Sequence, residues 1–119
     1  MASLLFFLLS LLLVSHSSPH NSTSDQEALL AFKSSLSLDP KNSLVDWSPN
    51  HSFFNWTGIV CSSRHQRVVS LDLSGKSLVG PISPFIGNLS FLRVLSLWNN
   101  HLGGVIPSQL GRIFCLRIV

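Results

Sequence analysis

The chain has 119 residues, of which 45% are hydrophobic and 11% are charged, and its formal net charge at pH 7 is +3. This length leaves room for one small domain at most. The positive charge is modest and spread along the chain, so it argues for solubility and against a nucleic-acid partner.

Residues 1–17 have the pattern of a secretory signal peptide. The apolar run from Leu4 to Val14 has eleven residues, fewer than the roughly 20 that a membrane-spanning helix needs. Small residues at Ser15 and Ser17 follow the run and offer a cleavage site. An uncleaved signal anchor is the alternative. No later apolar run approaches membrane length, so we predict no membrane helix in this chain.

Four Asn-x-Ser/Thr sequons follow the predicted signal peptide. They predict passage through a glycosylating secretory route, and therefore a location outside the cell or on the outer face of the plasma membrane. Such a compartment is oxidising and favours paired cysteines. The predicted glycosylation sites are Asn21, Asn50, Asn55 and Asn88.

Residues 24–63 are predicted to form a cap that begins with a helix. Ser24 and Glu27 have the spacing of a capping box, which places the helix start at Ser24. Apolar side chains then recur at helical spacing, at Leu29, Phe32 and Leu36. The Asp39-Pro40 pair is expected to end the helix, because the residue before a proline disfavours helical backbone angles.

Aromatic residues of the cap are expected to cover the first strand of the following segment, which has no earlier repeat to bury it. That strand is the segment RVVSLDL, and the aromatic residues are Trp47, Trp56 and Phe32. A ligand cage built from the same rings is the alternative.

The rest of the chain repeats with a period of 24 residues. The first copy spans residues 68–94 and the second spans residues 95–119. Counted from Leu71 and Leu95 inclusive, eight positions are identical between them. This period and the Leu-x-Leu core predict leucine-rich repeats, in which each coil contributes a short strand with two inward leucines. The expected fold is therefore an α/β leucine-rich repeat solenoid fragment, with an N-terminal helical cap and about two β-coil repeats.

Particular residues are expected to shape the turns of each coil. Asn100 is predicted to hydrogen-bond the backbone of neighbouring turns, and this ladder begins in the second repeat because the first has Lys76 there. Gly80 and Gly104 are expected where the chain bends too sharply for a Cβ. Because each coil buries only its neighbours, the second repeat is expected to leave an apolar face uncovered.

The chain from residue 25 onward resembles the N-terminal region of plant leucine-rich repeat receptor-like kinases and receptor-like proteins. The segment LSLWNNHLGGVIPSQLGRI is similar to the plant consensus LxLxxNxLxGxIPxxLG, and DQEALLAFKSSL with the later NWTGIVC is similar to the plant N-terminal cap. The resemblance implies an extracellular solenoid that binds a peptide, a small hormone or a co-receptor ectodomain. It also implies that the Ile-Pro segment of each coil forms a second short strand.

The kinase of such receptors is not expected in this chain, since the sequence has no glycine-rich loop, HRD or DFG motif. We therefore predict no enzyme activity and no cofactor. A metal site formed by His51, Cys61 and His65 was weighed, but the resemblance gives Cys61 a structural explanation instead.

The resemblance explains the cysteine at position 61. The family's cap has Cys-x-Trp-x-Gly-Val-x-Cys with the two cysteines bridged, whereas this chain has Phe54 in place of the first cysteine. We therefore expect Cys61 to be unpaired, because Cys115 lies more than two coils away and a disulfide needs a Cα separation below about 7 Å.

The strand residues that alternate with the inward leucines are predicted to contact a ligand on the concave face. They are Ser70, Asp72 and Ser74 in the first repeat and Val94, Ser96 and Trp98 in the second. Trp98 is singled out because tryptophan is enriched at binding hot spots. Packing of its ring on neighbouring repeat residues or on a glycan is the alternative.

Three functions remain open at this point. The first is the N-terminal part of a receptor ectodomain involved in cell-surface signalling or defence, which the uncovered final coil favours. The second is a short secreted binding, inhibitor or decoy protein. The third is a hydrolytic or metal-dependent enzyme, for which no catalytic set of residues was found.

Overall fold

A computed structural model describes residues 21–113 and 116–119, so the predicted signal peptide and Cys115 lie outside the described residues. The described chain begins with helix α2 (Ser22–Ser35). Three short 3-10 helices follow, namely η1 (Phe53–Asn55), η2 (Pro84–Asn88) and η3 (Ser108–Arg112). The strands are β1 (Ile59–Cys61), β2 (Val68–Asp72), β3 (Val79–Pro81), β4 (Val94–Ser96), β5 (His101–Gly103) and β6 (Arg117–Ile118).

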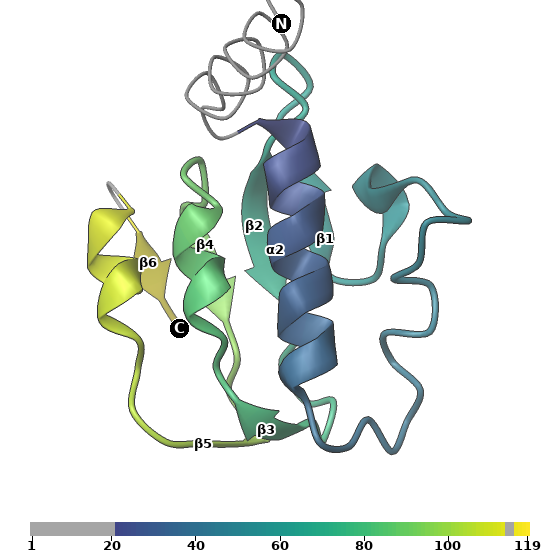
Figure 1. The fold of residues 1–119 in the computed structure, drawn as a ribbon, viewed down its shortest axis with the longest axis vertical. Helices are drawn as coiled ribbons and strands as arrows, with labels where there is room; N and C mark the ends of the chain where they lie inside the picture. Colours follow the sequence, from purple (N-terminus) through teal and green to yellow (C-terminus); the bar gives the residue numbers. More distant parts are fainter. Residues whose placement is uncertain (1–20, 114–115) are drawn as a thin grey trace, which may run out of the picture.

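The strands form two sheets. One sheet has the order β1-β2-β4-β6, with β1 antiparallel to β2 and the other pairs parallel. The second sheet pairs β3 with β5 in parallel. Figure 1 shows α2, η2 and η3 side by side over one face of the four-stranded sheet, with β3 and β5 at the far end of the coils. The predicted solenoid with a helical cap is confirmed.

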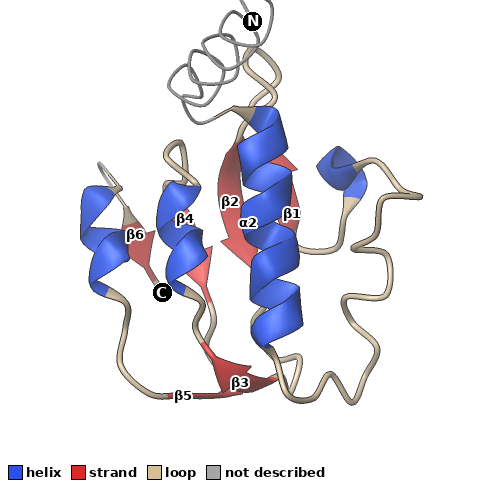
Figure 2. Cartoon of the chain, viewed as in Figure 1, coloured by secondary structure: helices blue, strands red, loops and turns tan. Residues whose placement is uncertain are grey.

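The second strand of each coil differs from the expectation in position (Figure 2). It was expected on the Ile-Pro segment, whereas β3 and β5 end just before Ile82 and before Ile106, respectively. In the first coil this strand also pairs with the cap, because Leu38 and Val79 form an antiparallel bridge. The second sheet therefore extends from the coils to the chain that follows α2.

Helix α2 begins earlier than predicted. Asn21 is the N-cap residue, and its Oδ1 accepts a hydrogen bond from the Ser24 amide at 3.0 Å. In return, Ser24 Oγ accepts a hydrogen bond from the Asn21 amide at 2.7 Å. The predicted capping box of Ser24 and Glu27 is therefore wrong, because Ser24 occupies the third helical position and acts as the reciprocal partner.

Helix α2 also ends earlier than predicted, at Ser35 rather than at Asp39-Pro40. The pairing of Leu38 with Val79 draws the backbone into an extended conformation before the proline is reached. Asp39 instead caps the next turn, where its carboxylate oxygens accept hydrogen bonds from two backbone amides at 2.9 Å.

One hydrophobic core runs through the cap and both coils. The Trp47 and Trp56 rings stack with centroids 5.6 Å apart, and the Phe32 ring lies 6.4 Å from that of Trp47. All three are buried in the same cluster as the inward leucines, so they are core residues and not a ligand cage. The fully buried leucines of the coils include Leu71, Leu73, Leu78, Leu89 and Leu92.

Two glycines allow the cap backbone to approach the first coil. Gly58, in the NWTGIVC motif, has φ +81°, and a Cβ there would collide with the Asp72 carbonyl oxygen. Gly80 has φ +146°, and its Cβ would lie 2.9 Å from Leu36 Cα. Neither position tolerates a side chain without a shift of the backbone.

Candidate binding surface

The predicted ligand contacts lie on the face of the four-stranded sheet that α2, η2 and η3 do not cover. Strands β2 and β4 are in register there, and the paired residues are Ser70 with Val94 and Asp72 with Ser96. The pairing continues past the strand ends, since the Gly75 amide donates to the Trp98 carbonyl oxygen at 3.1 Å. The candidates therefore form two adjacent rows on neighbouring coils.

The six candidates differ in exposure. The Trp98 side chain is 60% exposed, and Asp72 is also exposed. The half-buried candidates are Ser70, Ser74 and Val94. Ser96 is only 7% exposed, because it lies between β2 and β6 in the middle of the sheet. Little of the Ser96 residue is therefore open to a ligand, and its role as a contact stays a prediction.

The Asp72 carboxylate is held in place by Ser74. Its Oδ1 accepts hydrogen bonds from the Ser74 hydroxyl at 2.7 Å and from the Ser74 amide at 3.0 Å. These two bonds, the hydroxyl first, hold the pKa of Asp72 below its ordinary value, and Ser96 and Lys76 add smaller effects in the same direction. The carboxylate is therefore ionised at neutral pH and oriented on the exposed face.

Asn100 fixes the backbone that carries Trp98. Its Oδ1 accepts hydrogen bonds from the amides of Lys76 and Leu78 in the first coil, at 3.2 and 3.0 Å. Its Nδ2 donates to three carbonyl oxygens, those of Leu73, Leu97 and Trp98, at 2.7, 3.0 and 3.3 Å. One side chain thus hydrogen-bonds backbone groups of both coils at this turn, where the Trp98 carbonyl oxygen also accepts from the Gly75 amide.

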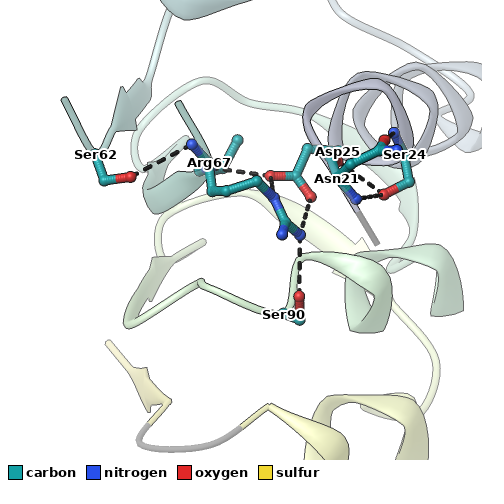
Figure 3. A network of polar contacts seen from close by, with 7 residues as sticks. Asn21, Ser24, Asp25, Ser62, Arg67 and Ser90 are labelled. Atoms are coloured by element: carbon teal, nitrogen blue, oxygen red, sulfur yellow. Dashed lines mark hydrogen bonds and ion pairs between the residues drawn. The ribbon is translucent and has the colours of Figure 1, made fainter. Parts of the chain in front are cut away.

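An ion pair inside the cap was missed by the sequence reasoning. Asp25, in the first turn of α2, is fully buried, and Arg67, just before β2, is 6% exposed. Arg67 Nε and Nη2 donate to the two carboxylate oxygens at 2.9 and 3.0 Å, and the Val68 amide donates to Oδ2 at 3.0 Å (Figure 3). A signal existed, because Asp25 shares a helix face with Ala28, Leu29 and Phe32.

Arg67 also reaches the end of the first coil, in the segment between η2 and β4. Its Nη2 donates to Ser90 Oγ at 3.0 Å, and its guanidinium carbon lies 4.5 Å from the centroid of the Phe91 ring. The His65 ring packs edge-on against the same phenyl ring at 5.5 Å. The cap helix, the start of β2 and the segment before β4 therefore meet at one guanidinium, which ties the first coil to the cap.

Cys61 is a free thiol among the described residues. Partial burial, and to a smaller extent the negative charge of Asp25, raises the pKa of this thiol. Phe54 stands at the position of the missing cysteine, where it is half-buried against the core with its ring centroid 4.3 Å from that of Phe53. Pairing with Cys115 is not tested, because Cys115 lies outside the described residues.

The predicted glycosylation sites lie at the surface to different degrees. Asn21, Asn50 and Asn55 are exposed, whereas Asn88 is half-buried at the end of η2. In two sequons the hydroxyl residue is also a structural partner, since Thr57 donates to Asp46 Oδ2 at 3.0 Å and Ser90 accepts from Arg67. Glycosylation itself stays a prediction.

Two negative findings apply to residues 21–113 and 116–119. Within these ranges no group of three or more His, Cys, Asp or Glu side chains is placed to hold a metal ion, so His51, Cys61 and His65 do not form the site that was weighed. Within the same ranges no helix is long and apolar enough to cross a membrane.

Comparison with known families matches two parts of the chain. The family described as "Leucine rich repeat N-terminal domain" matches residues 22–62, and the family described as "Leucine Rich Repeat" matches residues 91–113. The first range holds α2, η1 and β1, and the second holds β4, β5 and η3.

A curated plant receptor kinase is similar in sequence to nearly the whole chain. The chain is 44% identical over 119 residues to the LRR receptor-like serine/threonine-protein kinase EFR of Arabidopsis thaliana, with 97% of this chain aligned. It spans only 12% of the length of that kinase.

Two solved ectodomains from Arabidopsis are similar in structure. That of the receptor kinase GASSHO1/SCHENGEN3, in complex with CASPARIAN STRIP INTEGRITY FACTOR 2, has a TM-score of 0.73 and 28% identity over 80% of this chain and 12% of its own. That of the receptor kinase HAESA, in complex with an N-terminally extended IDA peptide hormone, has a TM-score of 0.69 and 34% identity over 81% of this chain and 16% of its own.

Proposed function

The chain belongs to the plant leucine-rich repeat proteins, and from this membership we propose that it forms the N-terminal part of a receptor-like kinase or receptor-like protein ectodomain. In this proposal the ectodomain binds a peptide, a small hormone or a co-receptor at the cell surface, in signalling or defence. Two similar solved ectodomains, which carry a bound peptide or factor in their complexes, support it. The observation that carries the proposal is the exposed Trp98 on an uncovered sheet face.

The proposal assigns a role to each part of the chain. Residues 1–17 direct secretion, and residues 24–63 form the cap that closes the N-terminal end of the core. The repeats at residues 68–94 and 95–119 present the sheet face to the partner. Glycans on the four sequons and a position outside the plasma membrane belong to the same proposal.

The binding part of the proposal can be tested with an array of extended synthetic peptides and the purified full chain. We expect the folded chain to retain a defined subset of peptides, and Trp98→Ala to lose most of that subset. Glu27→Gln, an exposed position on α2 away from this face, serves as the control. Retention of the same peptides by the urea-unfolded chain, or by Trp98→Ala, would contradict a binding role for this face.

The location can be tested with an antibody raised against the exposed segment at residues 63–66, which contains no sequon. A glycosylated product in the plasma-membrane fraction, larger than the 13.1 kDa of this chain, is the expected result for a receptor. A small product in the extracellular fluid would favour a secreted binding protein instead. A cytosolic product without glycans would contradict both.

A further inference from the structure

We infer, on the basis of the proposed function, that Asp72 and Trp98 together form a site for an arginine side chain of the partner. Both side chains are exposed, and neither belongs to the core that joins the cap and the coils. Their chemistry is complementary to a guanidinium, which forms hydrogen bonds to a carboxylate and stacks on an aromatic ring.

The register of the two coils puts both side chains within reach of one group, because the backbone pairing continues past the end of β4 to Trp98. Asp72 is paired with Ser96, and Trp98 follows Ser96 by two residues on the same side of the chain. Two residues of a strand rise about 7 Å, and diagonal neighbours on adjacent strands are about 7 to 8 Å apart, within reach of long and aromatic side chains. A guanidinium placed between them can contact both.

The carboxylate is ready to receive a cation. Ser74 orients it through two hydrogen bonds to Oδ1. The described residues contain one ion pair within 4.0 Å, that of Arg67 with Asp25, so no lysine, arginine or histidine among them neutralises Asp72 at that distance. Lys76 acts on it only weakly and from farther away.

The backbone that carries the indole is held in place. The Trp98 carbonyl oxygen accepts hydrogen bonds from the Gly75 amide and from Asn100 Nδ2, so the backbone is fixed before any partner arrives. A contact made by a fixed side chain loses little conformational entropy on binding. An apolar partner is disfavoured at this place, because it would strip water from the Asp72 charge without replacing its hydrogen bonds.

The inference can be tested by tryptophan fluorescence of the full chain. Trp47 and Trp56 are 1% and 2% exposed, so acrylamide quenches mainly Trp98. The probes are N-acetyl-Gly-Arg-Gly-amide and the same peptide with citrulline, which has the shape of arginine but no charge. We expect the arginine peptide to protect Trp98 from quenching, and to bind about fivefold more tightly than the citrulline peptide.

Asp72→Asn is the decisive variant, because its side-chain oxygen still accepts the Ser74 hydrogen bonds. It is expected to lose the preference for arginine over citrulline, while Glu27→Gln, which removes an exposed carboxylate on α2 away from this face, keeps it. Equal binding of the two peptides by the unmodified chain, or an undiminished preference in Asp72→Asn, would overturn the site. Equal binding of a lysine peptide would overturn the guanidinium assignment.

Failure of the arginine site and failure of the proposed function give different results. If the peptide array fails while arginine still protects Trp98, the receptor role is wrong and the cation site stands. If the array succeeds and Asp72→Asn retains the same peptides, the face binds a partner without an arginine at this place.

Discussion

At the scale of single residues, Asp25 joins the cap to the coils. Its fully buried carboxylate accepts three hydrogen bonds from Arg67 and Val68. Asp25→Asn removes the negative charge from beside a buried guanidinium, and loss of one partner of a buried pair costs about 3 to 5 kcal/mol. We expect the free energy of unfolding of Asp25→Asn, measured by urea denaturation, to fall by about 3 to 5 kcal/mol.

A matched control for this prediction is Glu27→Gln, on an exposed position of the same helix. Surface substitutions of this kind change stability by no more than about 0.5 kcal/mol. The double variant Asp25→Leu with Arg67→Met is expected to be more stable than either single variant, because no buried charge is then left without its partner. Equal losses for Asp25→Asn and Glu27→Gln would show that the ion pair is not a stability determinant.

Phe54 offers a second test at this scale. Phe54→Cys restores the two-cysteine pattern of the family, and a disulfide closing so short a loop is worth about 2 to 3 kcal/mol. The partial burial of the Phe54 ring is lost in exchange, so a net gain of about 1 to 2 kcal/mol is expected. Urea denaturation of the oxidised variant, with and without reductant, measures it.

The bridge itself is checked by mass spectrometry of the Phe54→Cys chain after proteolysis. Phe54→Ser is the control, because it removes the ring without supplying a thiol and should only destabilise the cap. If Cys61 remains open to alkylation in the oxidised Phe54→Cys variant, the substituted position is not the partner that the family pattern indicates.

At the scale of elements, the turn held by Asn100 links the two coils. Asn100→Ala leaves the amides of Lys76 and Leu78 and the carbonyl oxygen of Leu73 without their side-chain partner. Each unsatisfied buried group costs about 1 to 3 kcal/mol, and these groups are only partly buried. A loss of about 2 to 4 kcal/mol is expected in thermal or urea unfolding.

The neighbouring Asn99 gives the control for the ladder. Its φ is +59°, which glycine also adopts, so Asn99→Gly should cost much less than Asn100→Ala. Similar losses for the two variants would mean that the turn is held by its backbone alone. That result would mean that Asn100 does not fix the backbone of Trp98.

The elements also show how far the sequence could lead. Leu71 and Leu95 recur with a fixed period, and this periodicity is enough to predict the coils and their order. The start of α2 was placed too late because Asn21 was interpreted only as a sequon, although asparagine is also a preferred N-cap residue. Arg67 could not be paired with Asp25 in advance, because 42 residues separate them and only the docked cap brings them together.

The candidate surface was predictable only in part, because the burial of its residues depends on how whole coils stack. Alternation along the strands identifies which residues point away from the core, and Asp72 and Trp98 do so. It does not tell which of those residues neighbouring coils will cover. Ser96 is buried because its strand lies between β2 and β6, and that arrangement depends on the stacking of whole coils.

At the scale of the whole molecule, burial decreases along the solenoid. In the first coil Leu78 and Leu92 are fully buried, whereas their counterparts in the second coil, Leu102 and Leu116, are only half-buried. Since each coil of a solenoid is stabilised by its neighbours, the second coil is expected to open locally at a lower free energy than the first.

Two equivalent backbone hydrogen bonds make this difference measurable. The Arg93 amide donates to the Val69 carbonyl oxygen at 2.8 Å, and the Arg117 amide donates to the Arg93 carbonyl oxygen at 2.7 Å. Because the two bonds have the same geometry, a difference in hydrogen exchange reports the stability of the coils around them. We expect the Arg117 amide to exchange about tenfold faster than the Arg93 amide. This ratio corresponds to a difference of about 1.4 kcal/mol in the free energy of opening. Equal rates would mean that both coils open in one cooperative step, or that another molecule covers the second coil in solution.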